Sequence, residues 1–342
     1  PVVIVNEGTP ALALSTAALP DGRYAVTSVV GWSQDMAGRL ILLDRTDLSV
    51  RGWASLAEPY AYAGYDAARD EVVVAGQDNG TTTVYTFDVT GDQPLGTGVQ
   101  TLCQDCWPFF QGPVSGNGGV VVALEEGSTA TIRVHVRPPG NGTSFMPGEA
   151  IDGTTPALAA LPDRLLLVFL RDGRPYAATL DWTGVPLAEP VEIPIDAGDG
   201  VRAVTLGRPQ DGVVEAAAAV DRGGTLELVR LVLDADGGLV DARAVTAGPG
   251  YASELSLSQS GDTLAVAWGE TYGLGRVGAH LLVLRRSDGS VLHGPAVIAP
   301  TLDQTSSTYT VWAVAAPHPA GHAVFWGGWH EDTYYGLYGK LI

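Results

Sequence analysis

A repeat of about 48 residues runs along the whole chain and limits the folds that are open to it. Seven units follow one another, and each pairs a short apolar run with a second run beyond a loop. The first runs are Tyr24–Val30, Glu71–Ala75, Val120–Leu124, Leu165–Leu170, Val213–Val220, Leu264–Trp268 and Ala323–Trp326. Their partners are Arg39–Leu43, Thr83–Val89, Thr131–Val136, Tyr176–Leu180, Leu226–Leu233, His280–Leu284 and Gly336–Ile342. Runs of this length, several of them alternating, predict strands, and no stretch keeps a helical period.

Some units repeat the same short sequence. Ala265-Val-Ala-Trp-Gly269 matches Ala323-Val-Phe-Trp-Gly327. Three consecutive units also share a turn rich in Asp and Gly, where Gly allows a positive φ and Asp caps the backbone. After these turns we expect a short, weaker strand that follows the partner run, at Val185–Ile193, Leu239–Val245 and Val291–Ile298.

Four strands in each of seven units predict an all-β protein, a seven-bladed β-propeller in which stacked blades bury both faces of every sheet. The last unit ends after its third strand, whereas residues 1–6 form an apolar strand without a partner. We therefore predict that the N-terminal strand closes the ring as the outer strand of the last blade. The expected single domain, 1–342, divides into blades 7–56, 57–102, 103–151, 152–195, 196–247, 248–300 and 301–342 plus 1–6.

This architecture resembles that of bacterial exported β-propeller proteins, in which a strand ending in Val-x-Trp, a loop and a strand leading to an Asp/Gly turn recur. The resemblance covers nearly the whole chain and implies the fold alone. The Trp-Asp repeat pattern is absent from the sequence, and Ser258–Trp268 departs from the sialidase Asp-box by lacking its Gly-x-Thr-Trp ending. Two sandwich domains are the competing all-β interpretation, which explains the repeats and the N-terminal strand less well.

Charge and hydropathy exclude two classes of partner. The formal net charge is -19, so a surface that binds nucleic acid through its phosphates is not expected. The longest apolar runs have about six residues, whereas a membrane-spanning helix needs roughly 20, so no membrane insertion is expected. The sequence begins at Pro1 without a leader, as a processed export product or a domain taken from a longer chain does. We predict an exported protein that is periplasmic, secreted or on the cell surface.

One end of the ring collects aromatic and acidic residues. In a propeller, the loops between second and third strands share this axial face with the loops that join blades. The predicted ligand-binding residues there are Trp32, Asp35, Asp78, Trp107, Glu270, Tyr272, Trp329, His330, Glu331 and Tyr334. Aromatic rings beside hydrogen-bonding groups suit sugars and exposed peptide side chains. The alternative is that the rings, with Tyr60 and Tyr62 among them, fill the channel and the gaps between blades.

The chain has two cysteines, Cys103 and Cys106, and both lie on the predicted axial face. A zinc site needs further ligands with suitable spacing, and heme attachment needs a His where Trp107 stands. A local disulfide is therefore predicted, which implies an oxidising compartment. Redox or metal chemistry at this pair is the alternative.

Two other segments carry groups that bind metals in some proteins. His330 lies beside Glu331 and Asp332, but no other histidine has ligand spacing with it, so a solvated loop is expected. Asp196–Gly200 and Leu233–Gly237 are similar to calcium loops, but they lack the glutamate that ends an EF-hand loop. We predict hairpin turns there and no cofactor, with structural calcium as the alternative.

The predicted function is a non-catalytic binding or scaffold module that recognises a neutral glycan or a protein through the axial face. A polysaccharide-acting enzyme of the glycoside hydrolase or lyase type is the main alternative, because two carboxylates at the channel mouth would suffice for hydrolysis. A structural module within a larger surface assembly is the third. No catalytic residue is assigned, because no nucleophile or triad pattern stands out.

Overall fold

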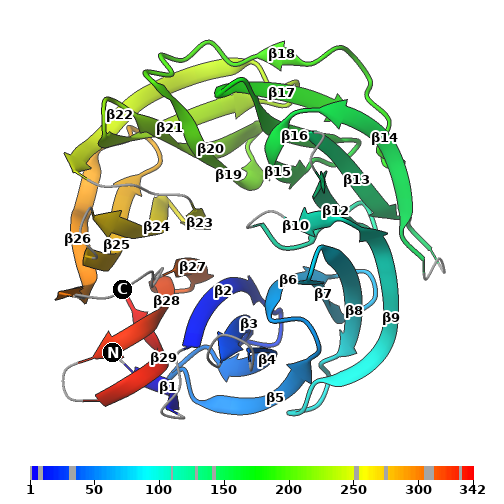
Figure 1. Ribbon diagram of the computed structural model, residues 1–342, viewed down its shortest axis with the longest axis vertical. Helices are drawn as coiled ribbons and strands as arrows, with labels where there is room; N and C mark the ends of the chain where they lie inside the picture. The colour runs from blue at the N-terminus through cyan, green and yellow to red at the C-terminus, as the bar shows by residue number, and fades with distance from the viewer. Residues whose placement is uncertain are drawn as a thin grey trace.

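Seven antiparallel sheets are arranged in a ring around a central axis (Figure 1). The computed structural model describes residues 2–6, 11–30, 36–108, 111–127, 130–140, 144–249, 254–272, 276–303, 312–330 and 333–342. Six sheets have four strands and one has five. The predicted all-β, seven-bladed propeller is therefore confirmed.

The blades follow the order of the chain. Blade 1 contains β2 (Ala11–Ala18), β3 (Arg23–Val30), β4 (Ala37–Asp44) and β5 (Val50–Leu56). Blade 2 contains β6 (Tyr60–Asp66), β7 (Glu71–Asp78), β8 (Thr81–Asp88) and β9 (Leu95–Gln104). Blade 3 contains β10 (Cys106–Pro108), β11 (Val114–Gly116), β12 (Gly119–Glu126), β13 (Thr131–Arg137) and β14 (Met146–Asp152). Blade 4 contains β15 (Thr154–Ala160), β16 (Leu165–Arg171), β17 (Arg174–Leu180) and β18 (Val191–Glu192).

The remaining blades complete the ring. Blade 5 contains β19 (Gly200–Gln210), β20 (Val213–Asp221), β21 (Thr225–Asp234) and β22 (Leu239–Pro249). Blade 6 contains β23 (Leu255–Ser260), β24 (Thr263–Tyr272), β25 (Arg276–Arg285) and β26 (Val291–Asp303). Blade 7 contains β27 (Ala313–His318), β28 (Gly321–His330), β29 (Thr333–Leu341) and β1 (Val2–Asn6). Strands β2, β6, β10, β15, β19, β23 and β27 lie nearest the middle of the ring (Figure 1).

The N-terminal strand closes the ring, as predicted. Strand β1 pairs antiparallel with β29, with Val2 opposite Gly339 and Asn6 opposite Gly336. Ile4 belongs to the apolar cluster between blades 7 and 1 and is 9% exposed. One sheet is therefore built from both ends of the chain.

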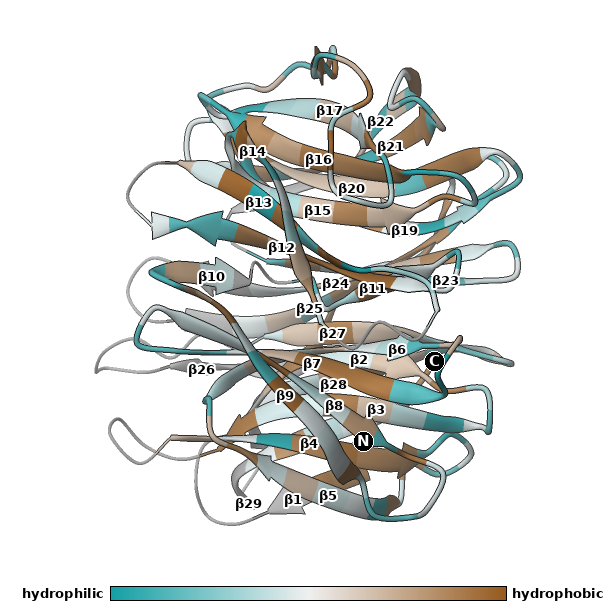
Figure 2. Cartoon of the chain, turned by 90° about the vertical axis from the view of Figure 1, so that its right-hand side faces the viewer, coloured by the Kyte–Doolittle hydropathy of each residue, from teal (hydrophilic) through white to brown (hydrophobic). Residues whose placement is uncertain are grey.

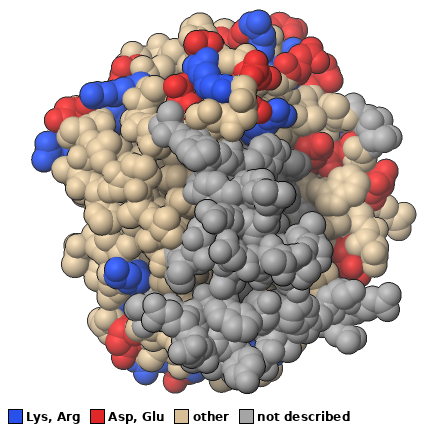
Figure 3. Space-filling view, turned by 60° about the vertical axis from the view of Figure 1, so that its left-hand side comes forward, with Lys and Arg blue, Asp and Glu red and all other residues tan. Residues whose placement is uncertain are grey.

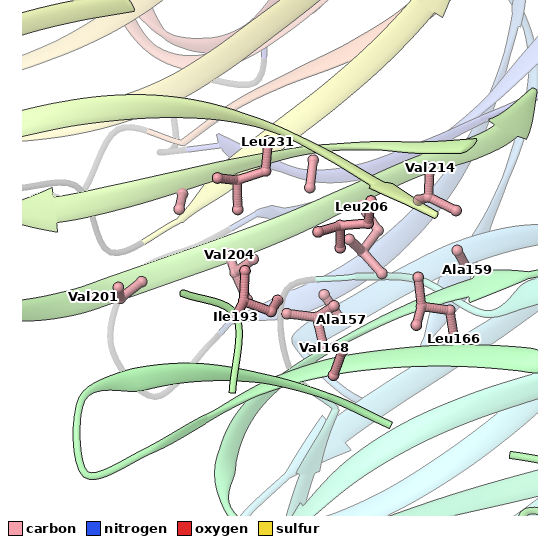
Figure 4. Close-up of a cluster of buried hydrophobic side chains, with 14 of the residues drawn as sticks. Ala157, Ala159, Leu166, Val168, Ile193, Val201, Val204, Leu206, Val214 and Leu231 are labelled. Carbon is pink, nitrogen blue, oxygen red and sulfur yellow. The ribbon is translucent and has the colours of Figure 1, made fainter. Parts of the chain in front are cut away.

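The core consists of apolar layers between neighbouring blades. Each pair of adjacent blades shares at least one buried cluster, and Figure 4 shows the cluster between blades 4 and 5. In β16, Leu166 and Val168 face blade 5, whereas Leu165 and Leu167 face blade 3. A strand buried on both faces is apolar at consecutive positions rather than at alternate ones, which explains the run Leu165–Leu170. Figure 2 shows the same feature, because β16 is brown along most of its length while many of the connecting loops are teal.

One predicted strand is too long. The sequence predicts Val185–Ile193 as the outer strand of blade 4, but β18 has only the two residues Val191 and Glu192. The segment contains Pro186 and Pro190, and Pro194 follows it. Proline has no N–H to donate to a neighbouring strand, so this sequence lies along the edge of the sheet with little pairing.

Arginines connect neighbouring blades at one end of the ring. We call this end the turn rim, because it carries the turns between the first and second strands and between the third and fourth strands of each blade. Arg69 in blade 2 donates to the carbonyl oxygens of Pro138 (3.0 Å) and Gly140 (2.6 Å) in blade 3. Arg164 in blade 4 pairs with Asp236 in blade 5 at 2.7 Å. These contacts tie the inner turns of blades 2 and 4 to the outer turns of blades 3 and 5.

Blades 6 and 7 are joined differently, since the chain ends lie where blade 7 would have its outer turn. His322 bridges the two blades: its Nδ1 lies 2.9 Å from Ser258 Oγ and its Nε2 lies 2.8 Å from Thr263 Oγ1. The Thr263 hydroxyl donates to the Ser260 carbonyl oxygen (2.6 Å), so it accepts from His322 Nε2–H, and Nδ1 accepts from Ser258. A neutral imidazole with its proton on Nε2 makes both polar bonds.

We expect the free energy of unfolding to decrease as the pH is lowered, because of His322. Burial lowers the pKa of His322 from 6.5 to about 4, so between these values the unfolded chain binds a proton that the native state does not. The contribution of His322 to native stability is therefore fully present above about pH 6.5 and is lost toward pH 4, by about 2–3 kcal/mol at pH 4.5. Urea unfolding at pH 7 and pH 4.5 measures the loss. His322→Gln should show a loss smaller by that amount, and equal losses in both proteins would contradict the assignment.

Acidic and basic groups are intermingled on part of the surface. On the face shown in Figure 3, red and blue atoms lie next to one another, mostly in the upper part of the view. Arg222, for example, pairs with both Asp196 and Glu227 at 2.9 Å.

No helix in the described part of the chain is long and apolar enough to cross a bilayer.

Candidate functional site

Strands of the same rank run in the same direction in every blade, so their ends lie at one end of the ring. The second strands β7, β24 and β28 end at Asp78, Tyr272 and His330, opposite the turn rim. The backbones of Glu270 and Tyr272 lie in β24, those of Trp329 and His330 in β28, and that of Tyr334 in β29. Trp32, Asp35 and Glu331 lie outside the described residues. Among the predicted site residues, the side chains of Asp78 and Trp107 are described.

The segment that enters blade 3 is fixed to blade 2. Cys103 and Cys106 form the predicted disulfide, and Cys106 is fully buried. The Cys106 N–H donates to the Gly80 carbonyl oxygen (2.8 Å), and the Thr82 hydroxyl donates to the Cys106 carbonyl oxygen (2.9 Å). Three short constraints therefore hold the residue that precedes Trp107.

Trp107 projects from this anchored segment and is 39% exposed. With the Gln77 amide oriented to suit its neighbours, its oxygen accepts from Trp107 Nε1–H (2.9 Å) and from the Gly80 N–H (3.1 Å). The indole N–H is thus satisfied within the protein, while part of the ring stays open to solvent. An exposed ring held in one orientation binds a flat apolar surface with little loss of side-chain entropy.

Acidic residues lie in the segments next to this tryptophan. Asp78 is exposed at the end of β7, and Asp105 is exposed within the disulfide loop. Glu125 lies opposite Trp107 in the β10–β12 pair. We call Gln77, Asp78, the Cys103–Cys106 disulfide, Asp105, Trp107 and Glu125 the Trp107 ledge.

Two carboxylates of β12 already have partners. Glu125 Oε2 accepts from the Thr155 N–H of blade 4 (3.1 Å), and partial burial raises the pKa of its carboxyl. Glu126 binds Arg133 through two contacts, from Arg133 Nε to Oε1 (2.6 Å) and from Arg133 Nη2 to Oε2 (3.2 Å). Asp78 and Asp105 are therefore the exposed carboxylates of the ledge.

Other aromatics of the axial face pack inside. Tyr62 is buried against Leu14 and Val29, with Trp312 at the edge of the same cluster. Burial raises the pKa of Tyr62 well above its ordinary value, and burial does the same to Glu254, which precedes β23. For Tyr62 the filling interpretation is right, whereas the Trp107 ring is partly exposed to solvent.

Of the segments that carry metal-binding groups, Asp196–Gly200 and Leu233–Gly237 lie within the described residues, whereas Glu331 and Asp332 do not. Asp234 Oδ1 accepts from the N–H groups of Asp236 (2.9 Å) and Gly238 (2.8 Å), so this loop is a hairpin turn capped by its own carboxylate. Asp196 Oδ1 likewise accepts from the Gly198 N–H (3.2 Å). Among the described residues, no group of three or more His, Cys, Asp or Glu side chains is placed to hold a metal ion.

Comparison with known proteins identifies the fold. No protein-family model matches the chain, and no curated protein sequence does. The structure of the Dos1 propeller matches with a TM-score of 0.51 at 10% identity, over 94% of this chain and 90% of that one. A chain of the Mitotic Checkpoint Complex gives 0.52 at 13% over 98% and 93%, and Saccharomyces cerevisiae Sqt1 gives 0.51 at 12% over 98% and 88%. Likeness at these identities establishes the propeller architecture.

Proposed function

We propose that this propeller is a non-catalytic binding module that recognises a protein or a neutral glycan through its axial face, with Trp107 as the anchor. The observation that carries the proposal is the exposed indole ring, whose N–H is already bound by Gln77. Asp78 and Asp105 supply acceptors for hydroxyl, amide or ammonium groups of the partner. A formal net charge of -19 disfavours an acidic partner within a Debye length of about 8–10 Å. A propeller of similar fold occurs in the Mitotic Checkpoint Complex.

Changing Trp107 to Ala should weaken binding and leave stability nearly unchanged. Loss of an anchor ring reduces affinity by about 1–3 kcal/mol. A neutral-glycan array and an array of basic peptides identify the ligand class, and titration of the best hit gives the affinity. Trp53→Ala is the matched control, because Trp53 is 48% exposed but lies on β5 at the outside of blade 1. If Trp107→Ala binds the ligand found on the arrays as tightly as the wild type does, the Trp107 ledge is not the binding site.

We further propose that the protein works outside the cytoplasm. The Cys103–Cys106 disulfide supports this location, because reducing compartments keep such pairs as thiols. Protein isolated from its native cells into a denaturing alkylating buffer should therefore show no mass gain from cysteine alkylation. Two alkylated cysteines in that sample would contradict the exported location.

A further inference from the structure

The outermost strands of the blades differ in how they prevent further pairing. An outer strand leaves main-chain N–H and C=O groups unpaired, and proteins protect such edges with charges, prolines or short strands. Among the strands that the structure describes, β18 has two residues and β1 has five. Of the five remaining outer strands, four contain charged residues or prolines, and β9 is the fifth. Strand β5 has Arg51, β14 has Pro147 and Glu149, β22 has Asp241 and Arg243, and β26 has Pro295 and Pro300.

Strand β9 has none of these protections. Its ten residues, Leu-Gly-Thr-Gly-Val-Gln-Thr-Leu-Cys-Gln, include no charge and no proline. Leu95 and Val99 are each 66% exposed. The β8–β9 pairing has two bulges, and between them Gly98–Thr101 keeps a continuous register with Thr83–Thr86. Figure 2 looks onto β9, which runs obliquely across the side of the ring that faces the viewer.

Neighbouring contacts hold the middle of β9 in place. The Gln100 side chain forms two bonds with the main chain of Phe145 in blade 3: it accepts from the N–H (2.8 Å) and donates to the carbonyl oxygen (3.0 Å). Thr97 Oγ1 donates to Thr86 Oγ1 at 2.9 Å. A strand held in this way loses little entropy when another strand pairs with it.

Acidic residues lie near both ends of this uncharged strand. Asp88 is opposite Leu95, and Asp92 lies in the turn before it. Asp105 follows Gln104 at the other end and is exposed. A second copy of this chain would bring the same carboxylates against these in either strand direction, which like-charge repulsion disfavours. An uncharged segment with basic ends has the complementary pattern.

We propose that β9 is a second docking surface, where an extended partner segment with an uncharged, β-forming centre and Lys or Arg at its ends adds a strand to blade 2. Main-chain hydrogen bonds along Gly98–Thr101 would supply affinity, and the charged ends would set position. The pairing segment Gly98–Thr101 lies outside the Trp107 ledge, although Cys103 and Asp105 at its far end belong to both surfaces, so main-chain pairing does not depend on the Trp107 ring. Trp107→Ala should leave it intact.

The test uses a fluorescein-labelled synthetic peptide with three Thr-Val pairs and two lysines at each end, followed by fluorescence anisotropy. Val99→Lys places a cation at the centre of the edge and should weaken peptide binding by about tenfold or more. Val297→Lys is the control, because it adds the same charge to an exposed position on β26, which is 52% exposed in the wild type. Equal weakening by both variants, or no binding by the wild type, would overturn the proposal.

Two modified peptides test main-chain pairing directly. One is N-methylated at every Thr and the other at every Val, so each loses the donors along one edge. Because a strand uses alternate N–H groups on each edge, one peptide should lose binding and the other should keep it. Equal binding by both would show attraction by the lysines alone. Self-association that Val99→Lys abolishes would name a second copy as the occupant and would also overturn the proposal.

Discussion

Removal of residues 1–6 is expected to lower the free energy of unfolding by at least about 4 kcal/mol, because blade 7 then loses its outer strand. Ile4 leaves the cluster between blades 7 and 1, and loss of a large buried aliphatic side chain alone costs about 2–5 kcal/mol. The edge of β29 also loses its partner, from Gly336 to Gly339. Urea unfolding of the shortened and intact chains measures the difference.

A matched variant separates the loss of β1–β29 pairing from a change of side chains in β1. Val2→Thr with Val3→Thr changes two exposed valines of β1 and keeps the strand, so it should shift stability by only about 0.5 kcal/mol. If the shortened chain unfolds at the same urea concentration as this variant, β1 does not complete blade 7 in solution.

Arg137→Met should lower the free energy of unfolding by about 3–5 kcal/mol, a large effect for a single substitution. Arg137 is 3% exposed, and its Nη2 lies 2.7 Å from Asp66 Oδ2 and 2.5 Å from Glu71 Oε1. Asp66 is 1% exposed and also contacts Arg69 at 2.7 Å, and the substitution does not remove this second partner. Methionine fills much of the same volume, so the variant isolates the lost charge, and Glu71 loses its ion pair beside a buried carboxylate.

The control for that substitution is an ion pair in solvent. Arg174 contacts Glu192 at 2.8 Å on the outside of blade 4, and both side chains are exposed. Arg174→Met should change stability by about 0–1 kcal/mol, since exposed pairs contribute little. Comparable effects of the two substitutions, measured by urea unfolding, would mean that the cluster around Asp66 tolerates the loss of Arg137.

The sequence predicts the middle strands best, because burial on both faces makes them continuous apolar runs. The runs Leu165–Leu170 and Val213–Val220 match β16 and β20 almost to the residue. Four strands per blade require an inner strand in every blade, but the sequence pattern does not show where these inner strands lie. Strand β15, Thr-Thr-Pro-Ala-Leu-Ala-Ala, shows why: it is built largely from small side chains near the axis and has no strong apolar run.

The candidate site could be predicted only in part. Its face followed from the strand order, and the disulfide followed from the presence of only two cysteines at short spacing. Whether a given ring is core or surface depends on the neighbouring blade, which local sequence does not encode. Tyr62 and Trp107 both lie on the first strand of a blade, yet Tyr62 meets Leu14 and Val29 of blade 1, whereas Trp107 is held at the surface by Gln77.

The pairing of β1 with β29 also has a consequence for the order of folding. Most blades can form from hairpins of neighbouring strands, whereas Val2 must meet Gly339 at the opposite end of the chain. The entropy lost on closing a loop grows with loop length, so we expect this contact to form last. Until then β29 presents an open edge, and the N-terminal strand of another molecule fits it as well as its own does. Refolding at high protein concentration should therefore yield strand-exchanged dimers in which every blade is native.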